Sequence, residues 1–244
     1  MKDYLKDLID HTYGLGCIEL IKITGTDTET QFNALDPKDK TVIISGTFAT
    51  PIADFIGVFG MPNLGKLKTI VGFNDYDDNA KIEITHETRD GESFPAYIHF
   101  ATQNGDFVND YRLMVKSIIE EQVKSVAFKG AMWNVEFEPS VASIQRLKRQ
   151  STAHSEELHF STKTEGTDLK IYFGTPSTHS GNFVFQANVG GSLTKPWKWP
   201  VKEFINIMDT VGDKKIRISD AGATEIVVDS GLAVYTYLLP AQAK

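Results

Sequence analysis

Apolar side chains recur at the spacing of an amphipathic helix in four stretches of the chain. In the first stretch Leu5, Leu8 and Ile9 share one face, and Gly14 follows as a stop signal. The second stretch opens with Pro51, a residue that suits the first turn of a helix. The pattern predicts helices over residues 3–13, 50–60, 139–152 and from 201 to the turn at 212–213, with 66–71 as a candidate for a further helical turn.

Shorter runs between these stretches have the alternation and β-branched content of strands. Turn-forming residues separate the runs, and Arg89-Asp90-Gly91 is a good hairpin turn. The predicted strands cover residues 17–24, 30–35, 40–48, 80–88, 94–102, 132–137, 157–163, 169–174, 182–189, 215–219, 224–228 and 233–239. Few helices and many strands are typical of an α+β protein with antiparallel sheets.

The order of the predicted elements repeats along the chain. A helix, three strands, a second helix and two or three further strands occur from the N-terminus and again from about Trp133. The order repeats, but the residues do not. It predicts two similar domains, residues 1–116 and 131–244, joined by an interdomain crossover at 117–130, each with two helices packed on antiparallel sheet. Such an architecture favours a scaffold over a catalytic pocket.

Composition and charge narrow the class of protein. The chain is 41% hydrophobic and 23% charged, as in a globular protein. Its N-terminus lacks the apolar core of a signal peptide, and no apolar run approaches the roughly 20 residues that span a bilayer, so no membrane partner is expected. Cys17 is the only cysteine, which excludes an intrachain disulfide and a multi-cysteine metal site and favours a reducing cytosol.

The net negative charge arises in the first half of the chain. Residues 1–116 hold 11 Lys and Arg against 18 Asp and Glu, whereas residues 117–244 hold 14 of each, which together give the net charge of −7. An acidic total argues against a protein that grips nucleic acid over its whole surface. It does not exclude a protein that meets DNA on a single face.

Catalytic chemistry is not apparent in the sequence. The chain has no phosphate-binding glycine loop, no nucleophile elbow and no zinc-protease motif, and its histidines are scattered. The acidic run at residues 75–79 lacks the later glycine and closing glutamate of a calcium loop. We therefore predict a protein without catalytic residues, metal or cofactor. An enzyme with an unfamiliar site stays open as an alternative, and it would need a concave cluster of polar groups.

Two stretches resemble a known family. Residues 52–59, Ile-Ala-Asp-Phe-Ile-Gly-Val-Phe, with Asn63-Leu64-Gly65 resemble the second helix of the tailed-phage (T-even-type) DNA sliding clamp, and the acidic turn at 75–78 with residues 81–85 fits the strand that follows. Residues 204–208, Gly212, 215–219, 223–228 and 234–239 are similar to the closing helix and strands of that clamp. The resemblance spans nearly the whole chain in order and length.

The resemblance implies the DNA-clamp fold and a non-catalytic function. Clamps of this family are homotrimeric rings of two-domain subunits, with helices around the hole and sheets outside. The ring encircles duplex DNA without reading its sequence and tethers the DNA polymerase, which makes synthesis processive, and a clamp-loader ATPase opens it. By this resemblance the protein would act in the cytoplasm of an infected bacterial host.

A ring that slides on DNA needs positive charge toward the phosphates. On the third predicted helix Arg146 and Arg149 lie opposite the apolar face of Val141, Ile144 and Leu147. The full set of candidate DNA-facing residues is Arg146, Arg149, Lys148, Lys66, Lys68, Lys202, Lys2 and Lys6. The first helix weakens this interpretation, because Asp3, Asp7 and Asp10 lie opposite its apolar face and would repel DNA.

Partner docking is the second function that the resemblance implies. Partners of clamps insert a short peptide with apolar anchors into a pocket between the two domains. The candidate pocket residues are Val115, Ile118, Ile119, Tyr237, Leu238, Leu239 and Pro240. For the last four, an ordinary strand packed on the domain core is an equally good interpretation.

A phage structural ring protein, such as a tail-tube or baseplate component, is the main alternative. Such proteins are also β-rich and form rings, but they polymerise or stack and do not respond to a clamp loader. The sequence does not distinguish the two classes by any single motif.

Overall fold

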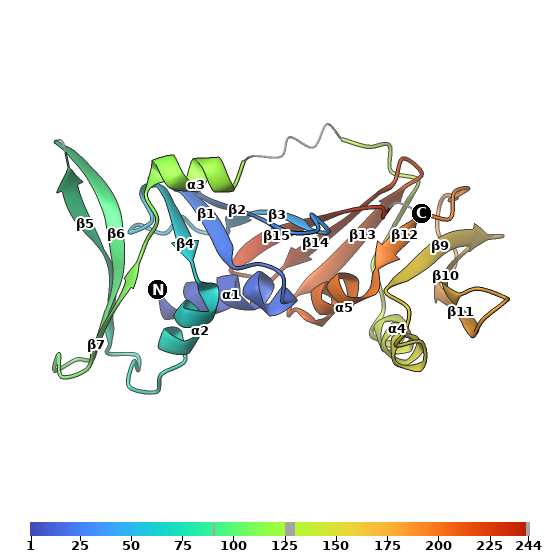
Figure 1. Cartoon of the computed structure of the whole chain (residues 1–244), viewed down its shortest axis with the longest axis horizontal. Coiled ribbons are helices and arrows are strands. Elements are labelled where there is room, and N and C mark those ends of the chain that lie inside the picture. Colours follow the sequence, from blue (N-terminus) through green and yellow to red (C-terminus); the bar gives the residue numbers. More distant parts are fainter. Residues whose placement is uncertain (90, 125–129, 243–244) are drawn as a thin grey trace. The chain divides into compact units, whose positions relative to one another are not determined.

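Helices and runs of strands alternate twice along the chain (Figure 1). The computed structural model describes residues 1–89, 91–124 and 130–242. The chain divides into two units. The first contains Met1–Lys38, Ile44–Val126 and Ser230–Tyr235, and the second contains Asp39–Ile43, Ala127–Asp229 and Thr236–Lys244.

Among the described residues, the first unit contains three α-helices and seven strands that begin within it or at its border. In chain order its elements are α1 (Lys2–His11), the 3-10 turn η1 (Tyr13–Leu15), β1 (Leu20–Gly25), β2 (Thr30–Leu35), β3 (Ile43–Phe48), β4 (Gly57–Pro62), α2 (Leu64–Val71), β5 (Lys81–Arg89), β6 (Glu92–Ala101), β7 (Val108–Arg112) and α3 (Lys116–Gln122). Helices α1 and α2 pack against each other.

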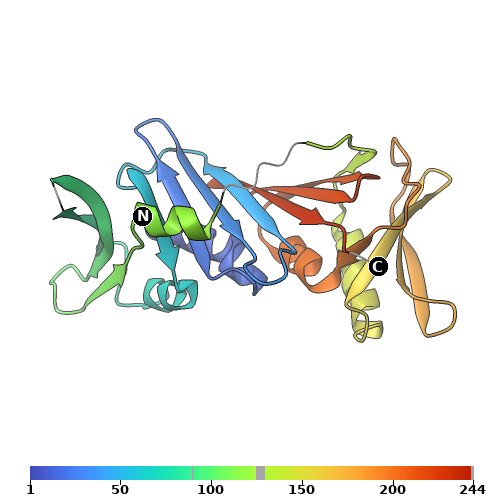
Figure 2. The ribbon, with the colours of Figure 1, turned by 45° about the horizontal axis from the view of Figure 1, so that its top comes forward.

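The second unit repeats this order after a short additional strand. Its elements are β8 (Val135–Phe137), α4 (Val141–Ala153), β9 (His159–Glu165), β10 (Asp168–Gly174), β11 (Ser180–Gln186), β12 (Lys198–Pro200), α5 (Val201–Asp209), β13 (Asp213–Ser219), β14 (Ala223–Asp229) and β15 (Ala233–Pro240). Helices α4 and α5 lie side by side (Figure 2).

The sheets repeat as well as the element order. In the first unit the strand order is β4-β1-β2-β3, and in the second the equivalent strands have the order β12-β9-β10-β11. The three remaining strands of each copy are also neighbours in chain order, β5-β6-β7 and β13-β14-β15. The α+β class and the repeated element order predicted from the sequence are therefore confirmed.

Periodicity explains why these segments adopt these elements. Along β10 the residues alternate between half-buried and buried, which gives one apolar face, as an antiparallel strand requires. On α1 the side chains of Leu5, Leu8 and Ile9 are buried on one helical face. Helix α4 begins where the Ser140 side chain accepts a hydrogen bond from the Ser143 N–H at 3.1 Å.

The helix predicted over residues 50–60 is wrong. Residues 57–62 form β4 instead, and the second helix begins only at Leu64, after Asn63 in the left-handed region at φ 54°. The candidate helical turn at 66–71 belongs to this helix. The segment that resembles the second helix of the phage clamp is thus mostly loop and strand in this protein.

Two glycines account for the error. Ile52, Phe55 and Phe59 are buried, and their spacing also suits a helix. Gly57, however, has φ 94°, and a Cβ at Gly60 would lie 2.8 Å from Cδ1 of Ile119. Glycine is poor in helices but permits this backbone conformation and this close approach of β4 to α3.

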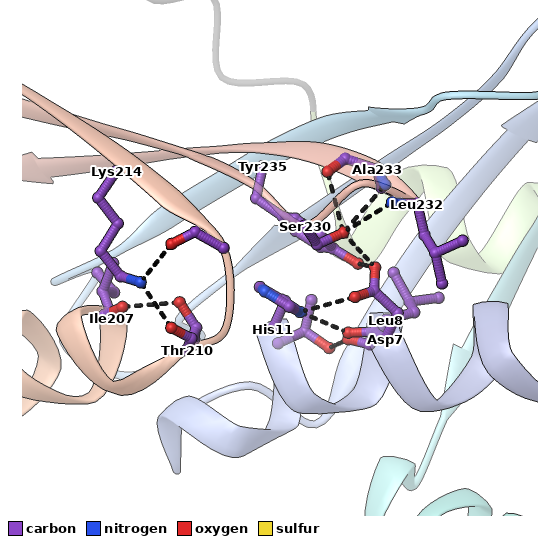
Figure 3. A network of polar contacts seen from close by, with 12 residues as sticks. Asp7, Leu8, His11, Ile207, Thr210, Lys214, Ser230, Leu232, Ala233 and Tyr235 are labelled. Carbon is purple, nitrogen blue, oxygen red and sulfur yellow. Dashed lines mark hydrogen bonds and ion pairs between the residues drawn. The ribbon is translucent and has the colours of Figure 1, made fainter.

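The partly buried carboxylate of Asp7, whose side chain is 11% exposed, joins the two ends of the sequence inside the first unit (Figure 3). The Asp7 carboxylate accepts hydrogen bonds from the Ser230 hydroxyl at 2.9 Å and from the Tyr235 hydroxyl at 2.7 Å. The ring of His11 stacks on Tyr235 with centroids 4.2 Å apart, and its Nδ1 lies 3.3 Å from the Asp7 carboxylate. Asp7 therefore faces inward, and the prediction that it lies with Asp3 and Asp10 on the open face of α1 is wrong.

The Asp7 carboxylate should contribute measurably to stability. Asp7→Ala would remove the carboxylate that accepts from the hydroxyl of the buried Tyr235, and a hydrogen bond to a charged group contributes about 1.5–3 kcal/mol. We expect Asp7→Ala to lower the free energy of unfolding by about 2 kcal/mol in urea titrations. Asp10→Ala removes an exposed carboxylate from the same helix and should change it by less than about 0.5 kcal/mol. Equal effects of the two substitutions would show that the network is not a stabilising one.

Candidate functional site

Helix α4 carries the clearest basic surface in the second unit. Leu147 is buried beneath it, whereas Arg146 and Arg149 are exposed. Within the described ranges neither guanidinium forms an ion pair or a hydrogen bond with another residue. The predicted apolar face is only partly correct, because Val141 is 76% exposed. Two guanidiniums on one helix, free of carboxylates, can bind phosphate groups.

Lys148 does not extend this basic surface freely. Its ammonium forms an ion pair with the Asp209 carboxylate on α5. The pair ties α4 to α5 and offsets the lysine charge. On α5 itself Lys202 is exposed, with Glu203 half-buried beside it.

The end of α5 holds a further lysine by its backbone. The Lys214 ammonium donates to the carbonyl of Thr210 at 2.6 Å and to that of Gly212 at 3.0 Å (Figure 3). Burial lowers the pKa of Lys214, while the carboxylates of Asp209 and Asp213 oppose the shift. This lysine satisfies carbonyls that follow a helix end and does not add to the exposed positive charge.

In the first unit the predicted lysines fall into two groups. Lys66 and Lys68 on α2 and Lys6 on α1 are exposed, and the Lys68 ammonium lies 5.7 Å from the ring centre of Tyr13. Lys2 instead donates to the Phe73 carbonyl at 3.4 Å and to the Tyr76 carbonyl. The structure therefore leaves Lys6, Lys66 and Lys68 available to a ligand and directs Lys2 to the loop after α2.

The residues predicted as peptide anchors differ in accessibility. In the first unit Ile118 is 46% exposed, but Ile119 is fully buried against β4. In the second unit Tyr237 and Leu239 are fully buried, and Leu238 and Pro240 on the opposite face of β15 are half-buried. Ile119, Tyr237 and Leu239 thus belong to cores, which leaves Ile118, Leu238, Pro240 and the half-buried Val115 as accessible anchors.

A groove in the first unit was not predicted from the sequence. It has a volume of about 870 Å³. Its lining comes from the start of β4, the β5-β6 hairpin and the beginning of α3: Ile56, Gly57, Val58, His86, Ser93, Phe94, Pro95, Val115, Lys116, Ser117 and Glu120. Of these residues only Val115 was predicted as a peptide anchor. With Val115, the apolar residues of the lining come from three separate segments that the fold brings together, and no local pattern marks them as one site.

Metal and membrane features add no further site. Among the described residues no group of three or more His, Cys, Asp or Glu side chains is arranged to hold a metal ion. Likewise, none of the helices described is long and apolar enough to cross a membrane.

Comparison with known proteins identifies the fold. No family model and no curated protein matches the sequence. Among solved structures, PCNA of A. fulgidus, bound to the C-terminal region of FEN-1, aligns over 100% of this chain and 96% of its own at a TM-score of 0.70 and 12% identity. PCNA of Entamoeba histolytica aligns over 99% and 94% at a TM-score of 0.67 and 11% identity. At this identity the likeness establishes the fold, which is that of sliding clamps.

Proposed function

We propose that the protein is a replication sliding clamp, a non-catalytic ring that encircles duplex DNA and tethers a DNA polymerase. The observation that carries the proposal is the full-length match to clamp structures from an archaeon and a eukaryote. The stretches that resemble the phage family suggest a T-even-type clamp that works with a clamp-loader ATPase in the cytoplasm of an infected bacterium. Within this proposal the two domains correspond to residues 1–116 and 131–244.

The distribution of charge supports contact with DNA through the helices. The protein has a net charge of −7, yet Arg146 and Arg149 are exposed on α4 without a carboxylate partner in the described part of the chain. Lys202 on α5 and Lys6, Lys66 and Lys68 on α1 and α2 are also exposed. Because α4 and α5 repeat the places of α1 and α2 in chain order, we place all four helices toward the DNA.

The duplication suggests how copies of the chain would join. In the first unit β3 is followed in its sheet by β15, of which Ala233–Tyr235 belong to that unit. In the second unit β11 occupies the position that β3 has in the first. In the first unit β7 occupies the position that β15 has in the second. Both β7 and β11 are edge strands in the sheets that the described residues form. We therefore place β7 of one copy beside β11 of the next, which closes a homotrimeric ring by repeating a pairing already present in one chain.

Partner proteins would dock through apolar anchors. Ile118, Leu238 and Pro240 keep accessible side chains, so we retain them with Val115 as contacts for a polymerase or clamp-loader segment. Ile119, Tyr237 and Leu239 would support these residues from the cores.

Solution mass tests the ring. Light scattering after gel filtration should give about 81 kDa, three times the chain mass of 27.1 kDa. Val108→Asp places a charge on the β7 edge, where Val108 is 46% exposed, and should shift the mass toward 27.1 kDa. Leu158→Asp, at a 75% exposed position outside both edges, should leave the trimer intact. A stable monomer of the unaltered chain would contradict the clamp, and open-ended assemblies would favour a tail-structure protein.

Charge reversal on α4 tests the DNA contact. Arg146→Glu with Arg149→Glu should weaken binding to duplex DNA at low salt about tenfold or more and reduce the slope of log K against log salt by about 2, because each lost phosphate contact removes about one counterion. With a cognate polymerase and loader the same variant should lose processive synthesis. The matched control is Lys163→Glu with Lys198→Glu, two exposed lysines on β9 and β12. If the α4 variant and the control behave alike, α4 does not meet the DNA.

A further inference from the structure

β4 is the edge strand of its sheet. Two observations show which of its residues direct their backbone N–H and C=O groups toward β1 and which direct them away. The Thr26 N–H donates to the Glu29 carbonyl at 2.8 Å in the β1-β2 hairpin, so the backbone groups of Thr24 and Lys22 face β2 and those of Ile23 face β4. Phe59, opposite Ile23, therefore bonds to β1. The next residue along β4 must direct its backbone groups away from β1.

The hydrogen bonds of Gly60 confirm that its backbone groups point away from β1. Gly60 exchanges both backbone hydrogen bonds with Met114, at 2.9 and 2.8 Å, on the side away from β1. Pro62, two residues on, has no N–H, and its carbonyl accepts from the Tyr111 hydroxyl. Burial and the nearby Glu19 carboxylate hold the pKa of Tyr111 above its ordinary value, so the hydroxyl stays protonated as a donor. The outer edge of β4 is thus occupied from Gly60 onward.

Val58 is the residue of this edge that is left open. It lies two residues before Gly60, so its N–H and C=O point to the same side. An antiparallel continuation of the chain beyond Met114 would meet these groups, but α3 begins at Lys116 and the chain turns away. Among the described residues none bonds to the outward backbone groups of Val58.

These open backbone groups lie in the groove of about 870 Å³. Ile56, which is 38% exposed, and the half-buried Phe94 and Val115 supply apolar side chains around Val58. The rim carries Lys116 and Glu120, one helical turn apart and opposite in sign, together with His86. A carboxylate and an apolar lining do not suit a nucleic acid. They suit a neutral, apolar segment of protein.

We infer that this groove binds a short extended peptide of another protein, which adds to β4 at Val58. The peptide would exchange two backbone hydrogen bonds with Val58 and continue the edge that Met114 begins. Side chains two residues apart on a strand point to the same face, so apolar residues at positions i and i+2 of the peptide would fill the groove. The groove lies wholly within the first unit, and the inference needs neither DNA nor ring closure.

A panel of fluorescein-labelled nine-residue peptides tests the inference by fluorescence anisotropy. Each peptide carries Ile, Leu or Phe at positions i and i+2 and Ser or Thr elsewhere, and the protein is the intact chain without DNA. Val58→Pro removes the outward N–H, which a β1-β4 ladder does not need, whereas Val58→Ala keeps it. We expect at least one peptide to bind, Val58→Pro to weaken it tenfold or more, and Val58→Ala to change its affinity less than threefold.

A second variant and a modified peptide distinguish a loss of binding from a loss of folding. Ile56→Lys, at a partly exposed position outside β4, should also weaken the peptide tenfold or more, and thermal unfolding and solution mass should show that each variant is folded. The bound peptide with its backbone N-methylated at alternate positions should lose affinity for the unaltered protein. Failure of the whole panel to bind, or equal binding to Val58→Pro and to the unaltered chain, would overturn the inference. Either result leaves the proposed contact with DNA untouched.

Discussion

The Asp7 carboxylate is the contact on which the rest of the first unit depends. It accepts hydroxyl hydrogen bonds from Ser230 and Tyr235, residues more than two hundred positions later in the chain. Those bonds hold the start of β15 where it can extend the sheet beyond β3. A carboxylate that is largely removed from water is costly unless hydrogen bonds satisfy it, so this arrangement is favourable only with residues from both chain ends in place. The first unit is therefore complete only with residues from the end of the sequence.

The backbone groups at sheet edges bear on the proposed function. Every strand at a sheet edge presents backbone groups that need a partner or exposure to water. The chain satisfies the edge of β3 with its own last strand, and the duplication leaves β7 and β11 as the equivalent open edges. β4 is covered by Met114 at Gly60 and open at Val58. The proposed assembly and the proposed peptide binding thus rest on the same kind of unfilled backbone hydrogen bonds.

The basic side chains also divide into those that bind groups within the protein and those that remain exposed. Lys2, Lys148 and Lys214 are directed to carbonyls or to a carboxylate within their own units. Arg146 and Arg149 extend from α4 without such partners in the described segments. A protein with a net negative charge can therefore present a local basic surface. The electrostatic potential at one face depends on which lysines and arginines lack an acidic partner there, and not on their total number.

Sequence by itself determined the α+β class, the duplicated order, most strands and three of the helices, because alternation and helical spacing are local properties of consecutive residues. It also placed Arg146 and Arg149 on an exposed helix face. Tertiary structure decided the rest. β4 replaced a helix because Gly57 adopts a φ of 94° and Gly60 allows a close approach to Ile119, a residue about sixty positions away. Asp7, Lys148 and the groove at Val58 took their roles from neighbours that are distant in sequence, and no local pattern records which distant residues will meet.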